Sequence, residues 1–390
     1  MQLKDRARIK IEKIAFGGEG VGRINNLVVF IPFAAPGDEL EIEITGCKKK
    51  FARGRILKIV QASPQRVNPL CKYYGHCGGC CYQHLSYEHQ LEIKKLQVEE
   101  VFKKIGSVAA PPVSGSVASP EIYHYRGKAQ FHRDSTSAAP QLGFLDISGG
   151  KIVDIERCEI MEETINKKIS RLREDLFIRN QKDARLNIWS ELPSDYTNRK
   201  GQMKRLAGGR EFLVPTDGFF QANLFLTDAL AAKVCSLATS GQVTNLIDTY
   251  CGCGLFSILL APFAGNILGI ELNEESIKFA RINAEKENMK NVKFIQGDVE
   301  KILARRHLLP EGEIDVIILD PPRAGCSKMI LESIASMQPR KIIYVSCNPA
   351  TQARDIKFLC ENGYNLLRLL PFDMFPQTQH IEVLGLLAHK

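Results

Sequence analysis

The amino-acid sequence predicts a multidomain α/β protein. The first 60 residues alternate short β-branched runs with glycine turns, a cysteine-rich segment follows, and beyond Pro215 strand-like and helix-like patterns alternate. Such alternation is typical of a doubly wound, mostly parallel sheet. A chain of 390 residues, 44% of them hydrophobic, can bury two or three cores. We therefore expect an N-terminal β-barrel over residues 1–62, a small central α+β domain over 63–208 and a Rossmann-like domain over 209–390.

The N-terminal segment reads as a barrel of the OB type. About five strands are expected between residues 7 and 60, with hairpin-like spacing and turns such as Pro36-Gly37-Asp38. Residues 1–60 hold 12 Lys and Arg against 7 Asp and Glu, and the basic side chains are densest in residues 48–55. This pattern favours a polyanionic partner such as single-stranded nucleic acid. A solvated charged hairpin would give the same pattern.

Composition excludes several other classes of protein. The formal net charge is +8, no apolar run is long enough to cross a membrane, and the first residues lack the apolar core of a signal peptide. We expect a cytoplasmic monomer with no membrane partner. Twelve cysteines in such a chain are better explained by metal ligation or catalysis than by disulfides.

The cysteine spacing predicts a metal centre. Cys71, Cys77 and Cys80 form C-x5-C-x2-C, and the distant Cys158 can supply a fourth thiolate. Zinc sites usually pair two short cysteine knuckles, and here there is only one, so the spacing favours an iron-sulfur cluster over zinc. Cys81 is adjacent to Cys80 and able in principle to replace it. A helix-like stretch near residues 84–105 follows the cluster.

A glycine turn in the C-terminal third predicts a nucleotide-type cofactor site. The strand ending at Asp248 runs into Thr249-Tyr250-Cys251-Gly252-Cys253-Gly254, and the next strand ends at Glu271, whose carboxylate can bind ribose hydroxyls. The third glycine of a pyrophosphate-binding loop is absent, which favours S-adenosylmethionine over NAD. Asp298 and Asp320 follow the ends of two further strands and face the same expected pocket.

Cys347 is the candidate nucleophile. It follows the strand-like run of residues 341–345 and precedes Asn-Pro, at the edge of the sheet where open α/β folds bind ligands. A thiolate is a strong nucleophile near neutral pH, and Glu382 can return protons. A buried structural cysteine is the alternative.

Together these features resemble the RNA uracil-C5 methyltransferases, most closely the iron-sulfur 23S ribosomal RNA type. The resemblance rests on the basic barrel, the cysteine spacing and four motifs in the expected order: Phe219-Phe220-Gln221-Ala222-Asn223, residues 248–254, Asp320-Pro321-Pro322-Arg323 and Ser346-Cys347-Asn348-Pro349. It implies a TRAM domain at the N-terminus and a helix near 84–105 that packs on the C-terminal domain. Leu255 departs from the polar Asn that relatives often carry there.

The resemblance also implies roles for individual residues. Cys347 would add to uracil C6 and Glu382 would take the C5 proton, in an enzyme of the EC 2.1.1 class. The cofactors would be S-adenosyl-L-methionine and a 4Fe-4S cluster, and the partner would be RNA, with rRNA processing the expected role. The cluster ligands would be Cys71, Cys77, Cys80 and Cys158, and the cofactor and target base would contact Gln221, Tyr250, Glu271, Asp298 and Asp320.

Three other functions remain open from the sequence. The same reaction on the transfer RNA T-loop fits the same motifs. A cytosine-C5 methyltransferase fits less well, because paired catalytic cysteines in Pro-Cys and Thr-Cys contexts would be expected and Cys347 follows Ser346. A non-catalytic iron-sulfur RNA-binding protein is the third.

Phe219 and Phe220 can stack on a flipped base or belong to the core.

Overall fold

The computed structural model describes residues 2–134, 141–178, 185–190 and 201–390. The chain divides into two compact units, each assembled from distant segments. The first contains Met1–Gln97, Glu121–Ile188 and Phe375–His380, and the second contains Val98–Pro120, Trp189–Met374 and Ile381–Lys390. The three consecutive domains expected from sequence, with limits at residues 62 and 208, stay a prediction.

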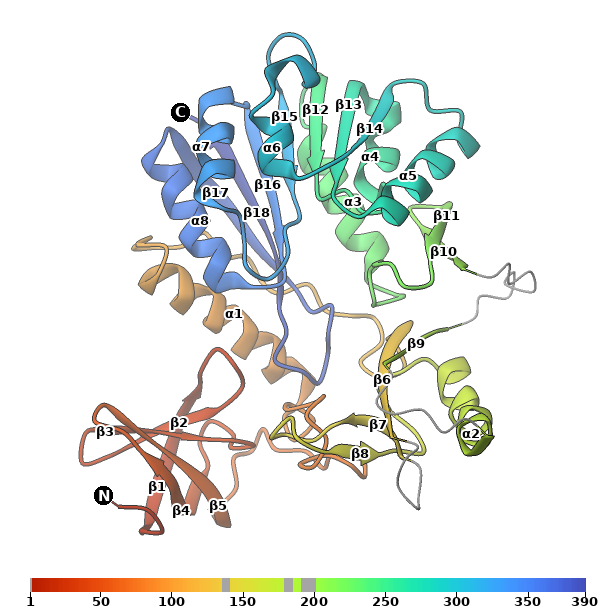
Figure 1. Ribbon diagram of the computed structural model, residues 1–390. Coiled ribbons are helices and arrows are strands. Elements are labelled where there is room, and N and C mark those ends of the chain that lie inside the picture. Colours follow the sequence, from red (N-terminus) through yellow and green to blue (C-terminus); the bar gives the residue numbers. More distant parts are fainter. Residues whose placement is uncertain (1, 135–140, 179–184, 191–200) are drawn as a thin grey trace. The chain divides into compact units, whose positions relative to one another are not determined.

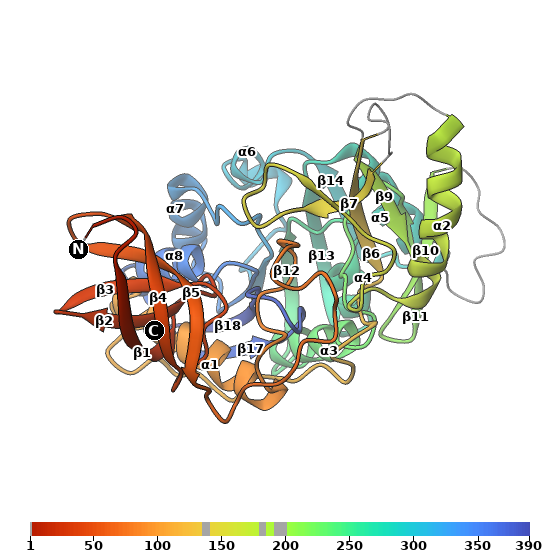
Figure 2. The same cartoon turned by 90° about the horizontal axis from the view of Figure 1, so that it is seen from below.

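The first unit begins with a closed five-stranded barrel, in the order β1-β2-β3-β5-β4 (Figure 2). Alternate strand residues point inward and form one apolar core that includes Val29, Ile31 and Leu40. Gly22 allows two strands to approach closely, because a Cβ there would lie 2.4 Å from the Lys10 carbonyl oxygen. The predicted barrel is confirmed, with strands β1 Arg6–Ile14, β2 Gly20–Ile24, β3 Leu27–Ile31, β4 Glu39–Cys47 and β5 Phe51–Gln61.

The rest of the first unit surrounds the cysteine loop. A four-stranded sheet has the order β8-β7-β6-β9, and helix α2 packs its apolar side on this sheet through Ile165 and Ile169. Helix α1 runs from the first unit into the second, where Val98, Val101 and Phe102 join the apolar core. The elements are α1 Tyr87–Lys104, β6 Lys128–Asp134, β7 Gln141–Leu145, β8 Ile152–Asp154, α2 Glu163–Ile178 and β9 Leu186–Trp189.

The second unit is a doubly wound α/β domain, as predicted. Its seven-stranded sheet has the order β14-β13-β12-β15-β16-β18-β17, in which β12 to β16 are parallel and β18 is antiparallel to both neighbours (Figure 1). The strands are β12 Val243–Thr249, β13 Ala264–Glu271, β14 Val292–Gln296, β15 Val316–Leu319, β16 Lys341–Ser346, β17 Tyr364–Phe372 and β18 Glu382–His389.

Helices cover both faces of this sheet (Figure 1). Helices α6, α7 and α8 share one apolar core with the end of α1, whereas α3, α4 and α5 pack against one another on the other face. No helix in the described ranges is long and apolar enough to cross a membrane. The remaining elements are β10 Gln202–Ala207, β11 Arg210–Pro215, α3 Thr227–Ala238, α4 Leu255–Leu260, η1 Ala261–Phe263, α5 Glu274–Lys286, α6 Val299–Leu303, η2 Arg306–Leu308, α7 Lys328–Met337 and α8 Pro349–Glu361.

Candidate active site

The sheet register brings Cys347 and Glu382 together. Cys347 follows the carboxyl end of β16, and the antiparallel strand β18 begins with Glu382 at the same edge. Ser346 is paired with Val383, so the next residue along β16 and the previous residue along β18 are neighbours. Asp320 follows the adjacent parallel strand β15 at this edge as well. The topological switch point between β12 and β15 lies beside them, where open α/β sheets bind ligands.

The Cys347 thiol is half-buried among charged groups. Burial and the negative charges of Glu382 and Asp320 raise its pKa from 9.0 to about 11. The Arg323 guanidinium acts in the opposite direction, because its positive charge and a hydrogen bond to the thiol stabilise the thiolate. Arg323 is therefore the group in this site that favours the nucleophilic form.

Two carboxyl groups beside the thiol also have displaced pKa values. Glu382 is buried with 5% of its surface exposed, and burial together with the charge of Asp320 raises its pKa well above 4.5. Burial and the charges of Asp248 and Glu271 raise the pKa of Asp320 to about 7. Carboxyl groups with raised pKa values in a pocket are suited to accept and release protons near neutral pH.

The glycine turn after β12 adopts a conformation that only some residues tolerate. Tyr250 has φ of 59°, Gly252 of 54° and Gly254 of 87°. The Gly252 amide donates a hydrogen bond of 3.1 Å to Glu271, which also accepts from the Asn273 amide at 2.7 Å. The predicted acidic residue thus lies directly against the predicted glycine loop, as a ribose-binding carboxylate requires.

Asp298 and Gln221 are the other two residues predicted to bind the cofactor. Asp298 is exposed and caps helix α6 by accepting from the Glu300 amide at 2.9 Å, although its charge is near enough to raise the pKa of Tyr250. Gln221 is buried in the segment before α3. Their contacts with a cofactor stay predictions.

Two buried asparagines support these loops and were not singled out from the sequence. Asn223 is fully buried and bonds Ser119, the Met374 carbonyl and the amides of Phe225 and Leu226, which fixes the segment that carries Gln221. Asn283 on α5 donates to the carbonyls of Leu213 and Cys253 and accepts from the Leu213 amide, so it ties β11 to the glycine turn. Single polar residues inside a helix or loop give no periodic signal.

The short cysteine loop of the first unit is organised by Gln83. This side chain is buried, accepts a 3.0 Å hydrogen bond from the Cys71 amide and also bonds Cys80. The Gly78 amide donates to the Leu145 carbonyl, which anchors the loop on β7. A Cβ at Gly78 would lie 2.9 Å from the Asp146 carbonyl oxygen, so this close approach requires glycine.

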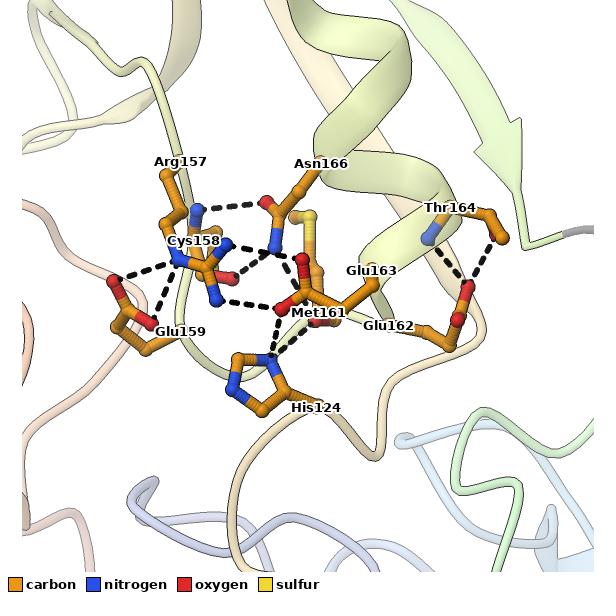
Figure 3. A network of polar contacts seen from close by, with 9 residues as sticks. All are labelled: His124, Arg157, Cys158, Glu159, Met161, Glu162, Glu163, Thr164 and Asn166. Carbon is orange, nitrogen blue, oxygen red and sulfur yellow. Dashed lines mark hydrogen bonds and ion pairs between the residues drawn. The ribbon is translucent and has the colours of Figure 1, made fainter.

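Cys158 is held by an asparagine at the start of α2 (Figure 3). Asn166 accepts from the Cys158 amide at 2.9 Å and donates to the Cys158 carbonyl at 3.1 Å. The neighbouring Arg157 pairs with Glu159 and Glu163, and these two ion pairs brace both sides of the cysteine (Figure 3). The side chain of Asn166 on α2 therefore fixes the backbone of Cys158, the predicted fourth ligand.

The four predicted ligands lie near enough to influence one another. Burial and the neighbouring thiols Cys77, Cys81 and Cys71 raise the pKa of Cys80 to about 12, and burial with Cys80 and Cys71 raises the pKa of Cys158. In the described ranges, no three or more His, Cys, Asp or Glu side chains are arranged closely enough to hold a metal ion. The charge interactions of Cys80 with Cys71 and Cys77, and of Cys158 with Cys80 and Cys71, nevertheless place these thiols in one region of the first unit.

Other predicted surface features take distinct places. Cys81 packs against an apolar cluster of the first unit, whereas Phe220 is buried and Phe219 is 66% exposed. The core interpretation therefore applies to Phe220 and the exposed ring remains available for stacking. In the barrel, three successive lysines at the β4–β5 turn, Lys48 to Lys50, are exposed.

Comparison with known proteins agrees with this geometry. A family model described as tRNA (Uracil-5-)-methyltransferase matches residues 195–390, and a TRAM domain model matches residues 5–57. An uncharacterized RNA methyltransferase of Halalkalibacterium halodurans is 32% identical, and the match covers 99% of this chain and 97% of that protein. A protein of the same description from Aquifex aeolicus is 32% identical over 100% of both chains.

A solved structure extends the likeness to the whole fold. The tRNA (uracil-54, C5)-methyltransferase of Pyrococcus abyssi, in complex with S-adenosyl-L-homocysteine, matches with a TM-score of 0.74 and 26% identity, covering 98% of this chain and 100% of that one. The chain therefore belongs to the S-adenosylmethionine-dependent RNA uracil-5 methyltransferase family and carries a TRAM domain at its N-terminus.

Proposed function

We propose that the protein methylates C5 of uridine in RNA through a covalent bond between Cys347 and C6 of the base. The observation that carries this proposal is the juxtaposition of a nucleophilic thiol with Glu382 at the carboxyl edge of the sheet. Uracil C5 is a poor nucleophile, and addition of a thiolate at C6 converts it into an enolate.

The proposed reaction has four steps. The Cys347 thiolate adds to C6, and the C5–C6 electron pair moves into the enolate. C5 then attacks the sulfonium methyl group, and S-adenosylhomocysteine leaves with the electron pair of the broken S–CH₃ bond. Glu382 takes the C5 proton, the enolate re-forms, and the C6–S bond breaks to release 5-methyluridine and the thiolate. The raised pKa makes the Glu382 carboxylate a stronger base toward the C5 proton, and the carboxyl group later releases this proton to water.

We propose ribosomal RNA as the substrate, with the 23S molecule the first choice, in the cytoplasm. Transfer RNA is a specific second candidate, because the family description and the Pyrococcus abyssi relative both name it. In either RNA the base would be flipped out of a loop to reach Cys347. The exposed ring of Phe219 would stack on an unpaired base, and the exposed lysines Lys48 to Lys50 would contact phosphates.

We propose further that Cys71, Cys77, Cys80 and Cys158 hold a 4Fe-4S cluster. The support is that these four thiols are neighbours in one unit and that Gln83 and Asn166 fix the backbone around them. Cys80 is preferred to Cys81, because Cys81 packs in an apolar core. A cluster at this site would supply a cross-link between the loop of residues 71–81 and the start of α2, without taking part in methyl transfer.

The test is an assay with the iron-reconstituted protein and tritiated S-adenosylmethionine. Unmodified 23S ribosomal RNA and transfer RNA are supplied separately, and nucleosides are identified after digestion. We expect labelled 5-methyluridine from ribosomal RNA and none from the Cys347→Ala variant. Label in transfer RNA alone would keep the reaction and change the substrate, whereas label at cytosine, or none in either RNA, would refute the proposed function.

A further inference from the structure

The loop that follows β15 is attached to helix α8 and its N-cap by several hydrogen bonds. This loop, residues 323–326, carries Arg323, whose side chain reaches the Cys347 thiol. The Asn348 side-chain amide donates to the Arg323 carbonyl at 2.9 Å, and the Thr351 hydroxyl donates to the same oxygen at 3.1 Å. Asn348 is also the N-cap of α8 and follows Cys347 directly, so one residue joins the nucleophile, the helix and the loop.

The next turn of α8 completes the attachment through Arg354 and Asp355. Asp355 is fully buried and accepts from the Cys326 amide at 2.8 Å and from the Tyr344 hydroxyl at 2.7 Å. Arg354 donates to the carbonyls of Ala324 and Cys326 at 3.1 Å each and pairs with Asp355. These bonds pair the Cys326 amide and the carbonyls of Ala324 and Cys326 with side chains of α8.

The fit leaves no space for another side chain at the centre of the loop. Gly325 has φ of 75°, and a Cβ there would lie 2.6 Å from the Asp355 carboxylate and 2.7 Å from the Arg354 guanidinium. The loop that begins with Asp-Pro-Pro-Arg therefore fits closely against Arg354 and Asp355, which lie about thirty residues later in the chain. The hydrogen bonds of Arg354 and Asp355 go to the loop and to Tyr344, so we expect their effect on the reaction to pass mainly through the loop.

We propose that Arg354 and Asp355 are positioning residues that hold the loop of residues 323–326 so that Arg323 stays against Cys347. This inference rests on the proposed function, in which the Cys347 thiolate is the nucleophile. A guanidinium held in place stabilises the thiolate continuously, whereas a guanidinium on a loose loop would spend time in solvent. The clamp would thus set the fraction of enzyme that is ready to attack.

The charged groups that face the thiol are few. Arg323 and Asp320 come from the chain after β15, and Glu382 comes from the start of β18. Of these three groups Arg323 favours the thiolate, so we expect the clamp to control the positive charge beside the thiol. Substitutions in the clamp should therefore act in the same direction as removal of Arg323, and by no more than that.

The test compares the pH dependence of Cys347 alkylation by iodoacetamide in Asp355→Asn, Arg354→Met and Arg323→Met. The peptide that contains Cys347 is quantified by mass spectrometry, and the exposed Cys47 serves as an internal reference. We expect each variant to shift the alkylation midpoint upward by about one pH unit, which lowers the rate at pH 8 about tenfold. The double variant Arg323→Met with Asp355→Asn should shift no further, and kcat should fall while KM for RNA stays within about twofold.

Lys357→Met on the same helix is the matched control and should keep the wild-type midpoint, because Lys357 is not part of the clamp. Arg354 is half-exposed, so its variant keeps the experiment informative if Asp355→Asn fails to fold. Unshifted midpoints, or a double variant with the sum of both shifts, would overturn the proposal. Alkylation needs neither RNA nor methyl donor, so a failed methylation assay leaves this result interpretable.

Discussion

The proposed nucleophile Cys347 lies in surroundings that oppose its ionisation. Burial and two carboxyl groups raise the pKa of the thiol, whereas Arg323 acts to lower it. The thiolate is therefore a minor species in the free protein at neutral pH. The fraction of Cys347 that is present as thiolate therefore increases as the pH rises.

The pH profile of methyl transfer tests this description of the site. Burial raises the pKa of Cys347 to about 11 and raises the pKa of Glu382 well above 4.5, so a rise in pH increases the deprotonated fraction of both groups. We expect kcat/KM, which reports the free enzyme, to increase from pH 6 to pH 9 without a plateau. Initial rates in buffers of constant ionic strength measure it, and a plateau below pH 8 would contradict the expected thiol pKa.

Glu382→Gln separates the first two steps of the reaction from the third. The amide cannot take the C5 proton, so kcat should fall by about 10²- to 10⁴-fold while methylated covalent RNA–protein adduct accumulates. The alkylation midpoint of Cys347 should move to lower pH, because a negative charge beside the thiol is lost. Denaturing gels and alkylation kinetics measure the two effects.

The exposed Glu361 at the end of α8 offers a matched control for this substitution. Glu361→Gln should change neither the gel pattern nor the alkylation midpoint. Free turnover by Glu382→Gln at the wild-type rate would assign the proton transfer to another group.

At this residue scale, the sequence predicted side chains that follow strand ends better than side chains that support them. Cys347 and Asp320 directly follow buried strands and Glu271 ends one, and parallel topology brings such positions to one edge. Gln83 and Asn166 fix the cysteine loops through single hydrogen-bond patterns that only the folded chain creates. No spacing rule connects an asparagine in a helix to a cysteine eight residues earlier.

At the scale of elements, the order of strands decides which loops meet. The parallel strands from β12 to β16 were predictable, because their β-branched runs are short, apolar and separated by helical patterns. Strand β17 was not predicted. It is an edge strand with an irregular register between Leu366 and Arg368 and contains Pro371, so its alternation of apolar and polar residues is interrupted.

Asn283 joins three elements around the cofactor loop, and its removal should weaken cofactor binding. Asn283→Ala leaves the buried carbonyls of Leu213 and Cys253 without this donor, at a cost of about 1–3 kcal/mol in unfolding free energy. The glycine turn also loses its tie to β11. We expect the affinity for S-adenosylhomocysteine to fall by about tenfold, measured by calorimetry alongside denaturant unfolding.

Asn245 provides a control of the same kind at the opposite edge of the sheet. It is buried, donates to the carbonyls of Glu311 and Glu313, and accepts from Asn266. Asn245→Ala should lose similar stability and keep its affinity for S-adenosylhomocysteine. Equal losses of affinity in both variants would show that the effect of Asn283 is only a general loss of stability.

At the scale of the whole molecule, the protein combines a basic barrel with a methyltransferase domain. The three exposed lysines at the β4–β5 turn are the densest positive charge of the barrel. If Lys48, Lys49 and Lys50 contact phosphates, replacing all three by alanine should weaken RNA binding and reduce the salt dependence. The slope of log K against log salt concentration should decrease in magnitude by about 2, because each of the three lost contacts contributes about 0.7 on a single strand.

The control for this change removes the same charge from the methyltransferase domain. Lys278, Lys290 and Lys293 are exposed, and their replacement by alanine should leave the salt slope near the wild-type value. Fluorescence anisotropy at several salt concentrations compares the proteins. Equal changes of slope in the two triple variants would indicate that only net charge matters, and not the barrel turn.

The most direct test of the central claim is to trap the covalent intermediate on RNA that contains 5-fluorouridine. A base that carries fluorine at C5 has no C5 proton to remove, so the reaction stops after methyl transfer. We predict a denaturation-resistant adduct that requires S-adenosylmethionine and maps by mass spectrometry to the peptide containing Cys347, with one methyl group on the base. Absence of an adduct, or its attachment to another cysteine or its persistence in Cys347→Ala, would contradict the assignment of Cys347 as the nucleophile.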